Sequence, residues 1–423
     1  STAVGYQALT AQTGVSGTVG NTAVGYQAGL SMTSGTQNVL IGYAAGDAMT
    51  DNTHCVAIGQ NALGACASGG IDNVAIGSNA ARVHTTGLRN IAIGKDAMDD
   101  TDAGSDSLDS DDNVFIGYDA GGGTWADAKS EFNVAIGNYA MDAAMNSCSS
   151  NVAVGYHSGG ALTTGNNNVF VGKNTGGVSS TASNCTYVGS ACGDSANTTA
   201  NTAMGYQALT DNAGVNNACF GAYAGKFATG ANNTLIGYGA GDTIVAGDEN
   251  TIIGKSCDTS AVDSTNQIVI GNNVTGTADN AIHIGNDTSH IRCDFNSDQT
   301  WDASSDLRQK TDIRPIEVGL AFINDLDPVK YKHRSPSEFP KEWKAYNPDD
   351  TTPMGGKDKY YYGFIAQSVK ACVDKYEMQD FSAWAVEPDG RQRVSREALV
   401  VTLVKAVQEL SAELQELKDK IGE

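Results

Sequence analysis

Apolar and polar residues alternate in one short unit that recurs along the first two thirds of the chain. Residues 73–77, Asn-Val-Ala-Ile-Gly, form a representative copy, with apolar side chains one and three positions before the glycine. Seventeen such glycines lie between Gly5 and Gly285 at a mean spacing of 17.5 residues, and the residue before each is apolar. A unit this short cannot bury its own apolar residues, so successive units must stack as a solenoid.

Each unit predicts a short β-strand, because alternate side chains of a strand point to the same face. A turn follows, and many units then carry a second segment of small residues, such as Tyr-Ala-Ala-Gly at residues 43–46. We therefore expect two short strands per unit and a narrow, all-β coil, stacked at about 4.8 Å into a rod on the order of 80 Å long. Asn stands four residues before the glycine in 12 of the 17 copies, which predicts a structural ladder of side-chain amides.

The pattern changes after residue 304 to that of a small α+β domain. Residues 316–326 have helical spacing, residues 329–332 alternate like a strand, and residues 360–369 predict a strand that leads into a helix. A long helix is expected over about residues 395–421. Its apolar residues follow the a/d pattern of a coiled coil, which favours self-association over packing on its own domain. They are Val400, Leu403, Val407, Leu410, Leu414, Leu417 and Ile421.

Composition divides the chain at the same place. Residues 1–304 contain 44 of the 50 glycines, no proline and a net charge of -19, whereas residues 305–423 contain all 7 prolines and a net charge of -3. Such an acidic surface repels nucleic acid and anionic membranes. No apolar run approaches the roughly 20 residues that cross a bilayer, so we expect no membrane insertion. The chain starts inside a repeat and without Met, from which we expect an N-terminal truncation and a missing anchoring region.

Candidate ligand sites in the repeats are weak. The nine cysteines lack paired C-x-x-C spacing and are expected to be reduced, buried thiols rather than zinc ligands or disulfides. The acidic insertion at residues 99–112 could hold Ca²⁺ or contact a receptor. It lacks the spacing of a calcium loop, which favours a solvated loop. We expect no cofactor and no metal, and no pair of carboxylates predicts a glycosidase.

Aromatic residues of the repeats have two possible roles. Residues 122–132, which contain Trp125, are expected to form a second projecting loop. Trp125 and the recurring tyrosines could stack on sugar rings, but an aromatic residue at a fixed offset of a repeat is more often used in packing. The tyrosines are Tyr6, Tyr26, Tyr43, Tyr118, Tyr206 and Tyr238.

The repeated units resemble the head repeats of trimeric autotransporter adhesins, which also occur in phage tail fibres. The resemblance rests on the recurring pattern Asn-x-Ala-Ile/Val-Gly-x-x-Ala and covers roughly residues 1–285. It implies a left-handed β-roll assembled as a homotrimer, with apolar residues filling each roll and small residues meeting at the threefold axis. Residues 286–304 lose the period and are expected to form a neck.

Residues 305–423 resemble the endosialidase-type intramolecular chaperone domain, a self-cleaving serine peptidase at the C-terminus of phage tailspikes and fibres. The segment from about residue 332 to residue 359 is longer than in the family pattern. Three motifs in the family's order carry the resemblance: Trp301-x-x-x-Ser305-Asp306-x-Arg308-x-Lys310-x-x-Ile313, Gly363-Phe364-Ile365-Ala366-Gln367, and Leu399-Val400-x-x-Leu403-Val404-Lys405-Ala406-Val407-Gln408-Glu409-Leu410.

This resemblance implies a catalytic dyad of Ser305 and Lys310 that cuts the chain between Ser304 and Ser305. A serine hydroxyl is a poor nucleophile at neutral pH, and a neutral lysine amine can take its proton. Such an amine must be desolvated or placed near other cations, and Arg308 and Arg314 are available for the latter. Burial on trimer formation is expected to activate the lysine.

Two further residues of the first motif, Asp306 and Arg308, are expected to orient the loop or close an ion pair. The resulting prediction is a homotrimeric phage tail fibre or spike, an extracellular part of the virion. Its partners are further copies of itself and a host cell-surface receptor, either a glycan or an outer-surface protein, and not nucleic acid. The alternatives are a bacterial trimeric surface adhesin with an uncleaved chaperone domain and a glycan-degrading tailspike.

Overall fold

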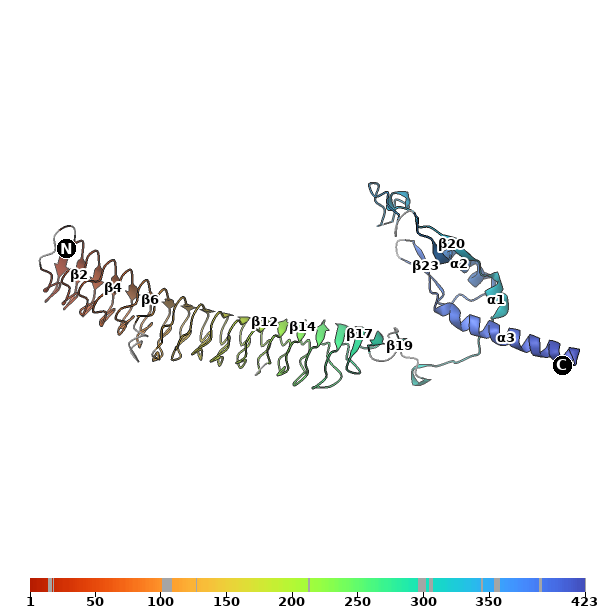
Figure 1. The fold of residues 1–423 in the computed structure, drawn as a ribbon, viewed down its shortest axis with the longest axis horizontal. Helices are drawn as coiled ribbons and strands as arrows, with labels where there is room; N and C mark the ends of the chain where they lie inside the picture. Colours follow the sequence, from red (N-terminus) through yellow and green to blue (C-terminus); the bar gives the residue numbers. More distant parts are fainter. Residues whose placement is uncertain are drawn as a thin grey trace. The chain divides into compact units, whose positions relative to one another are not determined.

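The computed structural model divides the chain into two compact units, Ser1–Ser304 and Ser305–Glu423. Figure 1 draws the first unit from red to green and the second mainly in blue. The structure describes residues 1–423 apart from 14–16, 18, 101–108, 127, 212–213, 296–301, 304–306, 344, 354–357, 388–389 and 423.

The first unit is a β-solenoid in which each coil contributes one strand to a parallel ladder, visible in Figure 1 as a row of short arrows. Equivalent residues pair in register, as Val74 pairs with Ile91 and Ile91 with Val114. The predicted solenoid is therefore confirmed. Its strands are β1 (Thr2–Val4), β2 (Thr22–Val24), β3 (Val39–Ile41), β4 (Val56–Ile58), β5 (Val74–Ile76), β6 (Ile91–Ile93), β7 (Val114–Ile116), β8 (Val134–Ile136), β9 (Val152–Val154), β10 (Val169–Val171), β11 (Thr186–Val188), β12 (Thr202–Met204), β13 (Ala218–Phe220), β14 (Thr234–Ile236), β15 (Thr251–Ile253), β16 (Ile268–Asn272) and β17 (Ala281–Asn286).

The expectation of a second strand in each coil is wrong, because the described small-residue segments form successive turns. Their backbone enters the left-handed region at alternate residues, as at Gln27 (φ 56°) and Gly29 (φ 61°) in one coil and Ala44 (φ 50°) in the next. A strand requires extended dihedrals throughout. Hydrogen bonds still join the coils here, since the Gly29 amide donates to the Ala45 carbonyl at 2.9 Å.

In each three-residue strand from β2 to β15 the middle residue points into the coil and its two neighbours point outward, and Val269 in β16 and His283 in β17 occupy the same inward position. Ala75 and Phe115 are fully buried in this way, whereas Ile136 and Ile253 are more than a third exposed. Turn residues such as Met49 fill the remaining interior. Apolar residues therefore fill the roll, as expected: the narrow interior takes the middle side chains of the strands, and the flanking Val and Ile residues form an outer apolar face.

A ladder of buried amides runs through the solenoid at the strand entries. The Oδ1 atom of Asn113 accepts the Asn133 backbone amide at 3.0 Å and its Nδ2 group at 3.1 Å. Asn133 accepts the same two bonds from Asn151, at 3.1 and 3.0 Å. Each Asn thus ties the next coil through backbone and side chain at once, and the structural role predicted for this position is confirmed.

The solenoid ends in antiparallel pairing. Strand β18 (His290–Asp294) folds back along β17, and β19 (Asp302–Ala303) pairs with β18. The interior position of the last coil is occupied by His283, which is fully buried. The segment expected to form a neck therefore begins with a strand that covers the last parallel strand.

The second unit has the predicted α+β character, with two antiparallel strand pairs and a long terminal helix. Its core centres on Phe322, Val369, Val373 and Leu399. The terminal helix begins three residues later than expected, and the β22–β23 hairpin was not predicted. The elements are η2 (Leu307–Gln309), α1 (Leu320–Asp325), β20 (Pro328–Tyr331), η3 (Pro336–Glu338), β21 (Tyr361–Phe364), α2 (Ala366–Lys375), β22 (Trp384–Val386), β23 (Gln392–Val394) and α3 (Ala398–Ile421).

Candidate functional site

The predicted cleavage junction lies at the boundary of the two units. Ser304, Ser305 and Asp306 lie outside the described residues. The described structure resumes at η2, where the backbone amide of Lys310 donates to the carbonyl of Leu307 at 3.1 Å. The roles of these residues in cleavage remain predictions.

The cations near the junction are exposed in the single chain. Arg308 and Lys310 both present their side chains to solvent. Arg314 forms a forked ion pair with Asp312, with its Nε and a terminal nitrogen each 2.8 Å from a carboxylate oxygen, which offsets its charge. A catalytic lysine has to be desolvated. Use of Lys310 as a base therefore requires an additional cover over this segment.

Helix α3 presents two different faces. Leu399, Thr402 and Ala406 are buried against the rest of the unit. The neighbouring stripe carries the predicted self-association residues, each about half exposed or more: Val400, Leu403, Val407, Leu410, Leu414, Leu417 and Ile421. The structure thus leaves the predicted seam accessible along the whole helix, whereas a helix used only for its own core would bury its apolar stripe.

Helix α3 also holds the start of helix α1. The backbone amide of Leu320 donates to Oε2 of Glu409 at 2.6 Å, and Lys405 lies 3.5 Å from the other carboxylate oxygen. A Cβ atom on Gly319 would lie 2.6 Å from Oε2 of Glu409 and 2.9 Å from the Ala406 nitrogen, so only glycine fits between the two helices. Sequence reasoning missed this contact, because a glutamate beside a coiled-coil seam reads as a solvent-facing residue.

The second family motif lies where β21 leads into α2, as predicted. Phe364 packs against the core and also lines an apolar groove of about 280 Å³. Leu326, Leu399 and Leu403 line the same groove. Because Leu403 is a seam residue of α3, the groove and the exposed seam form one continuous apolar surface.

The aromatic residues of the repeats differ from expectation at one position. Trp125 is fully buried and its Nε1 donates to the Gly121 carbonyl at 2.9 Å, so it neither projects nor offers a stacking surface. Tyr6, Tyr26 and Tyr43 are exposed and stack ring on ring, with centroids 5.3 and 5.1 Å apart. Packing between coils, the favoured role, is confirmed for these tyrosines.

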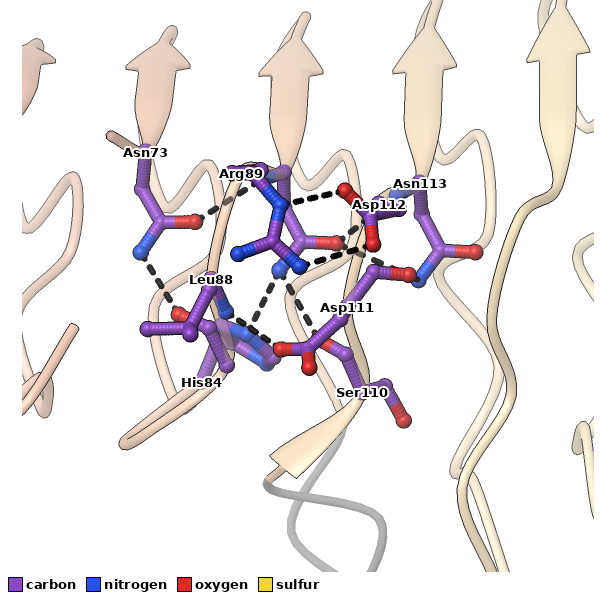
Figure 2. Close-up of polar contacts among 10 residues, drawn as sticks. Asn73, His84, Leu88, Arg89, Ser110, Asp111, Asp112 and Asn113 are labelled. Carbon is purple, nitrogen blue, oxygen red and sulfur yellow. Dashed lines mark hydrogen bonds and ion pairs between the residues drawn. The ribbon is translucent and has the colours of Figure 1, made fainter. Parts of the chain in front are cut away.

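The described C-terminal end of the acidic insertion, Asp111 and Asp112, bonds to the preceding coil, as Figure 2 shows. Asp112 forms a forked ion pair with Arg89, at 2.6 and 2.8 Å, and Asp111 accepts the Leu88 backbone amide at 2.6 Å. Behind them His84 is fully buried, with its Nε2 3.0 Å from Nδ2 of Asn90. Burial lowers the pKa of His84 to about 4, so the ring is neutral and accepts from the amide ladder.

Other candidate chemistry is limited in the part of the chain that the structure describes. No group of three or more His, Cys, Asp or Glu there could hold a metal ion, and no described helix is long and apolar enough to cross a membrane. All nine cysteines are free and buried, as expected. Burial raises the pKa of Cys66 and Cys148 to about 12, so both thiols stay protonated.

The structure thus defines a β-solenoid joined to a small α+β domain that ends in a long helix with an exposed apolar seam. Residues 305–376 match the model of the family Peptidase_S74, described as chaperone of endosialidase. This match implies a self-cleaving peptidase activity in the C-terminal domain and, with the solenoid, fits a tail-fibre-like protein. No curated protein and no solved structure matches the chain.

Proposed function

We propose that this chain is the shaft of a homotrimeric phage tail fibre or spike that attaches to a host cell-surface receptor. The C-terminal domain brings three copies together, sets their register and then releases itself by cutting between Ser304 and Ser305. One observation carries this proposal. Residues 305–376, which match the chaperone-of-endosialidase family, directly follow a solenoid whose outer face is apolar. Attachment is the role that a long repetitive solenoid supports best.

Self-association is supported by the outer face of the solenoid. Strand residues along its length remain more than a third exposed although they are large and apolar: Val24, Ile41, Ile136, Met204, Phe220, Ile236 and Ile253. A continuous apolar face of this kind marks an interface. Covering such a residue contributes roughly 1 to 2 kcal/mol. Further copies of the same chain fit the face best, because the coils of an identical copy repeat at the same spacing.

The cleavage step needs only the chain and water. Lys310, once desolvated, takes the hydroxyl proton of Ser305, and the oxygen attacks the carbonyl carbon of Ser304. The bond from that carbon to the Ser305 nitrogen breaks, the nitrogen takes a proton, and an ester links the two residues. Water then hydrolyses the ester, which leaves a carboxylate on Ser304 and a free amino group and hydroxyl on Ser305.

Intact mass spectrometry of the purified protein tests the proposal. The unmodified chain should yield two fragments, residues 1–304 and 305–423, while Ser305→Ala and Lys310→Ala should remain at full length. Ser304→Ala serves as the matched control, because it alters the neighbouring hydroxyl and should still be cut. A single full-length species from the unmodified, assembled chain would refute self-cleavage. Light scattering of the Ser305→Ala chain tests the trimer separately.

A further inference from the structure

We propose that Glu409 is a positioning residue for the cleavage reaction, which couples self-association through helix α3 to the segment that carries Lys310. This inference rests on the proposed function, since it assigns a role within that reaction. Its basis is the contact between Glu409 and the start of helix α1, described above for the single chain.

The contact is close on both sides. The Glu409 carboxylate accepts the Leu320 amide at 2.6 Å, one of the N–H groups at a helix start that the helix itself leaves unbonded. Gly319 lies against the α3 backbone with no room for a side chain. The ion pair with Lys405, one turn earlier on α3, holds the carboxylate in place. We call Gly319, Leu320, Lys405 and Glu409 the clasp.

The clasp and the apolar seam occupy the same turns of helix α3. Ala406 and Glu409 face α1, whereas Val407 and Leu410 immediately follow them and are exposed on the seam. Partners that cover Val407 and Leu410 would restrict the motion of this part of α3. Because Glu409 is held on the same two turns, the start of α1 would become equally restricted.

The segment from the clasp back to Lys310 is short and internally braced. Only residues 311–318 separate Lys310 from Gly319. Val318 packs against the core of the unit, and the Arg314–Asp312 fork and Pro315 limit the freedom of the stretch between. Fixing the start of α1 therefore narrows the positions open to Lys310, and a misplacement of about 1 Å can cost a factor of roughly 100 in rate.

The consequence is an order of events. In the single chain the apolar seam of α3 is exposed and the Lys310 side chain faces solvent. Assembly through the seam restricts the motion of α3, and the clasp restricts the start of α1 in turn. Lys310 is then held where its amine can accept the hydroxyl proton of Ser305. Cleavage would then follow assembly within each copy, because every contact of the clasp lies in a single chain.

Comparing cleavage rates of Glu409→Ala, Glu409→Gln and Glu413→Ala after synthesis of the full chain tests this role. Glu409→Ala should slow cleavage at least tenfold, while Glu409→Gln, whose amide oxygen can still accept the Leu320 amide, should restore most of the rate. Glu413→Ala is the matched control one turn along the exposed part of α3 and should cut normally. On a Ser305→Ala background, Glu409→Ala should still assemble to the same oligomeric state as the Ser305→Ala parent.

Cleavage of each copy within mixed trimers distinguishes a positioning role of Glu409 from a general loss of stability. When a Glu409→Ala copy assembles with copies that retain Glu409, only the altered copy should stay uncut. Normal cleavage of Glu409→Ala, loss of its assembly, or equal slowing of all copies in mixed trimers would each overturn the inference. If the unmodified chain is never cut, the proposed function itself fails. If the unmodified chain and the Glu409→Ala chain are cut at the same rate, only the role of Glu409 fails.

Discussion

Replacing Asn133 by alanine should open the solenoid around β8 and β9. Its side chain makes four hydrogen bonds in the interior. Nδ2 donates to Oδ1 of Asn113 at 3.1 Å and to the Cys148 carbonyl at 2.8 Å, and Oδ1 accepts from the Asn151 backbone amide at 3.1 Å and Nδ2 at 3.0 Å. The alanine variant keeps the backbone of Asn133 but removes all four bonds.

The size of the effect follows from these contacts. A buried hydrogen bond contributes about 1 kcal/mol net, so the four bonds together contribute about 4 kcal/mol to holding these coils closed. The Asn133 side chain is fully buried, so the groups that it leaves behind are also removed from solvent. A loss of about 4 kcal/mol increases the local opening equilibrium by a factor of about 1,000.

Hydrogen exchange measured by mass spectrometry on the intact protein resolves this effect by position. Peptides covering β8 and β9 should lose protection, whereas those covering β2 and β15 should not, because each coil contacts only its neighbours. Asn138→Ala is the graded control and should cause a much smaller loss of protection, because the exposed Asn138 side chain belongs to the same coil but is seen to accept one hydrogen bond between coils, from the Tyr118 backbone amide at 3.0 Å. Unchanged protection of β8 and β9 in the Asn133 variant would refute the reasoning that the amide ladder holds the coils together.

Gly137→Ala should destabilise the shaft by several kcal/mol, because its Cβ would lie 2.3 Å from the Gly155 carbonyl oxygen at a φ of 140°; the unfolding midpoint in denaturant measures this. Ile136→Asp should leave the fold of the single chain intact but weaken self-association, which light scattering on the Ser305→Ala background detects. Below pH 6.5 the unfolded chain protonates His84 while the folded chain does not until about pH 4. Stability should therefore fall by about 3 kcal/mol across that window, and His84→Met should remove this part of the pH dependence of the unfolding midpoint.

Much of the solenoid could be predicted because its strongest signals are local and repeated. The recurring glycine, the apolar residue before it and the Asn four positions earlier each act through the neighbouring coil, so a period in sequence becomes a period in space. The side of the strand that faces inward could not be predicted. Val74 and Ile76 alternate with Ala75 equally well in either orientation, and the choice depends on how much room the turn segment leaves inside the coil.

The second segment of each coil was mispredicted for a related reason. Residues such as Gln27 and Ala44 have no local preference for positive φ, yet they adopt it because hydrogen bonds to the adjacent coils favour that backbone. Trp125 was misplaced in the same way, since an insertion read as a projecting loop returns its aromatic ring to the interior. In both cases contacts between coils override the local pattern.

Parts of the candidate site could be predicted only where residue spacing or a family motif marks them in the sequence. The seam of α3 follows from spacing, and the proposed dyad of Ser305 and Lys310 follows from a resemblance. The clasp depends on Glu409 meeting Leu320, two residues 89 positions apart in the chain, and no periodicity or motif spacing connects them. Contacts of this kind come from the fold of the α+β unit.

The regularity of the solenoid supports the registering role proposed for the C-terminal domain. Most coils offer a similar outer face and the same amide ladder, and equivalent strand residues pair in register, as Val74 with Ile91 and Ile91 with Val114. Copies shifted by one coil would bury almost the same apolar residues, so the shaft alone distinguishes the correct register from its neighbours by little free energy. Helix α3 contributes a seam of limited length that begins at one place in each chain. Association there first would align the shafts from one end, and removing the domain afterwards would leave the aligned shaft separated from other registers by a kinetic barrier.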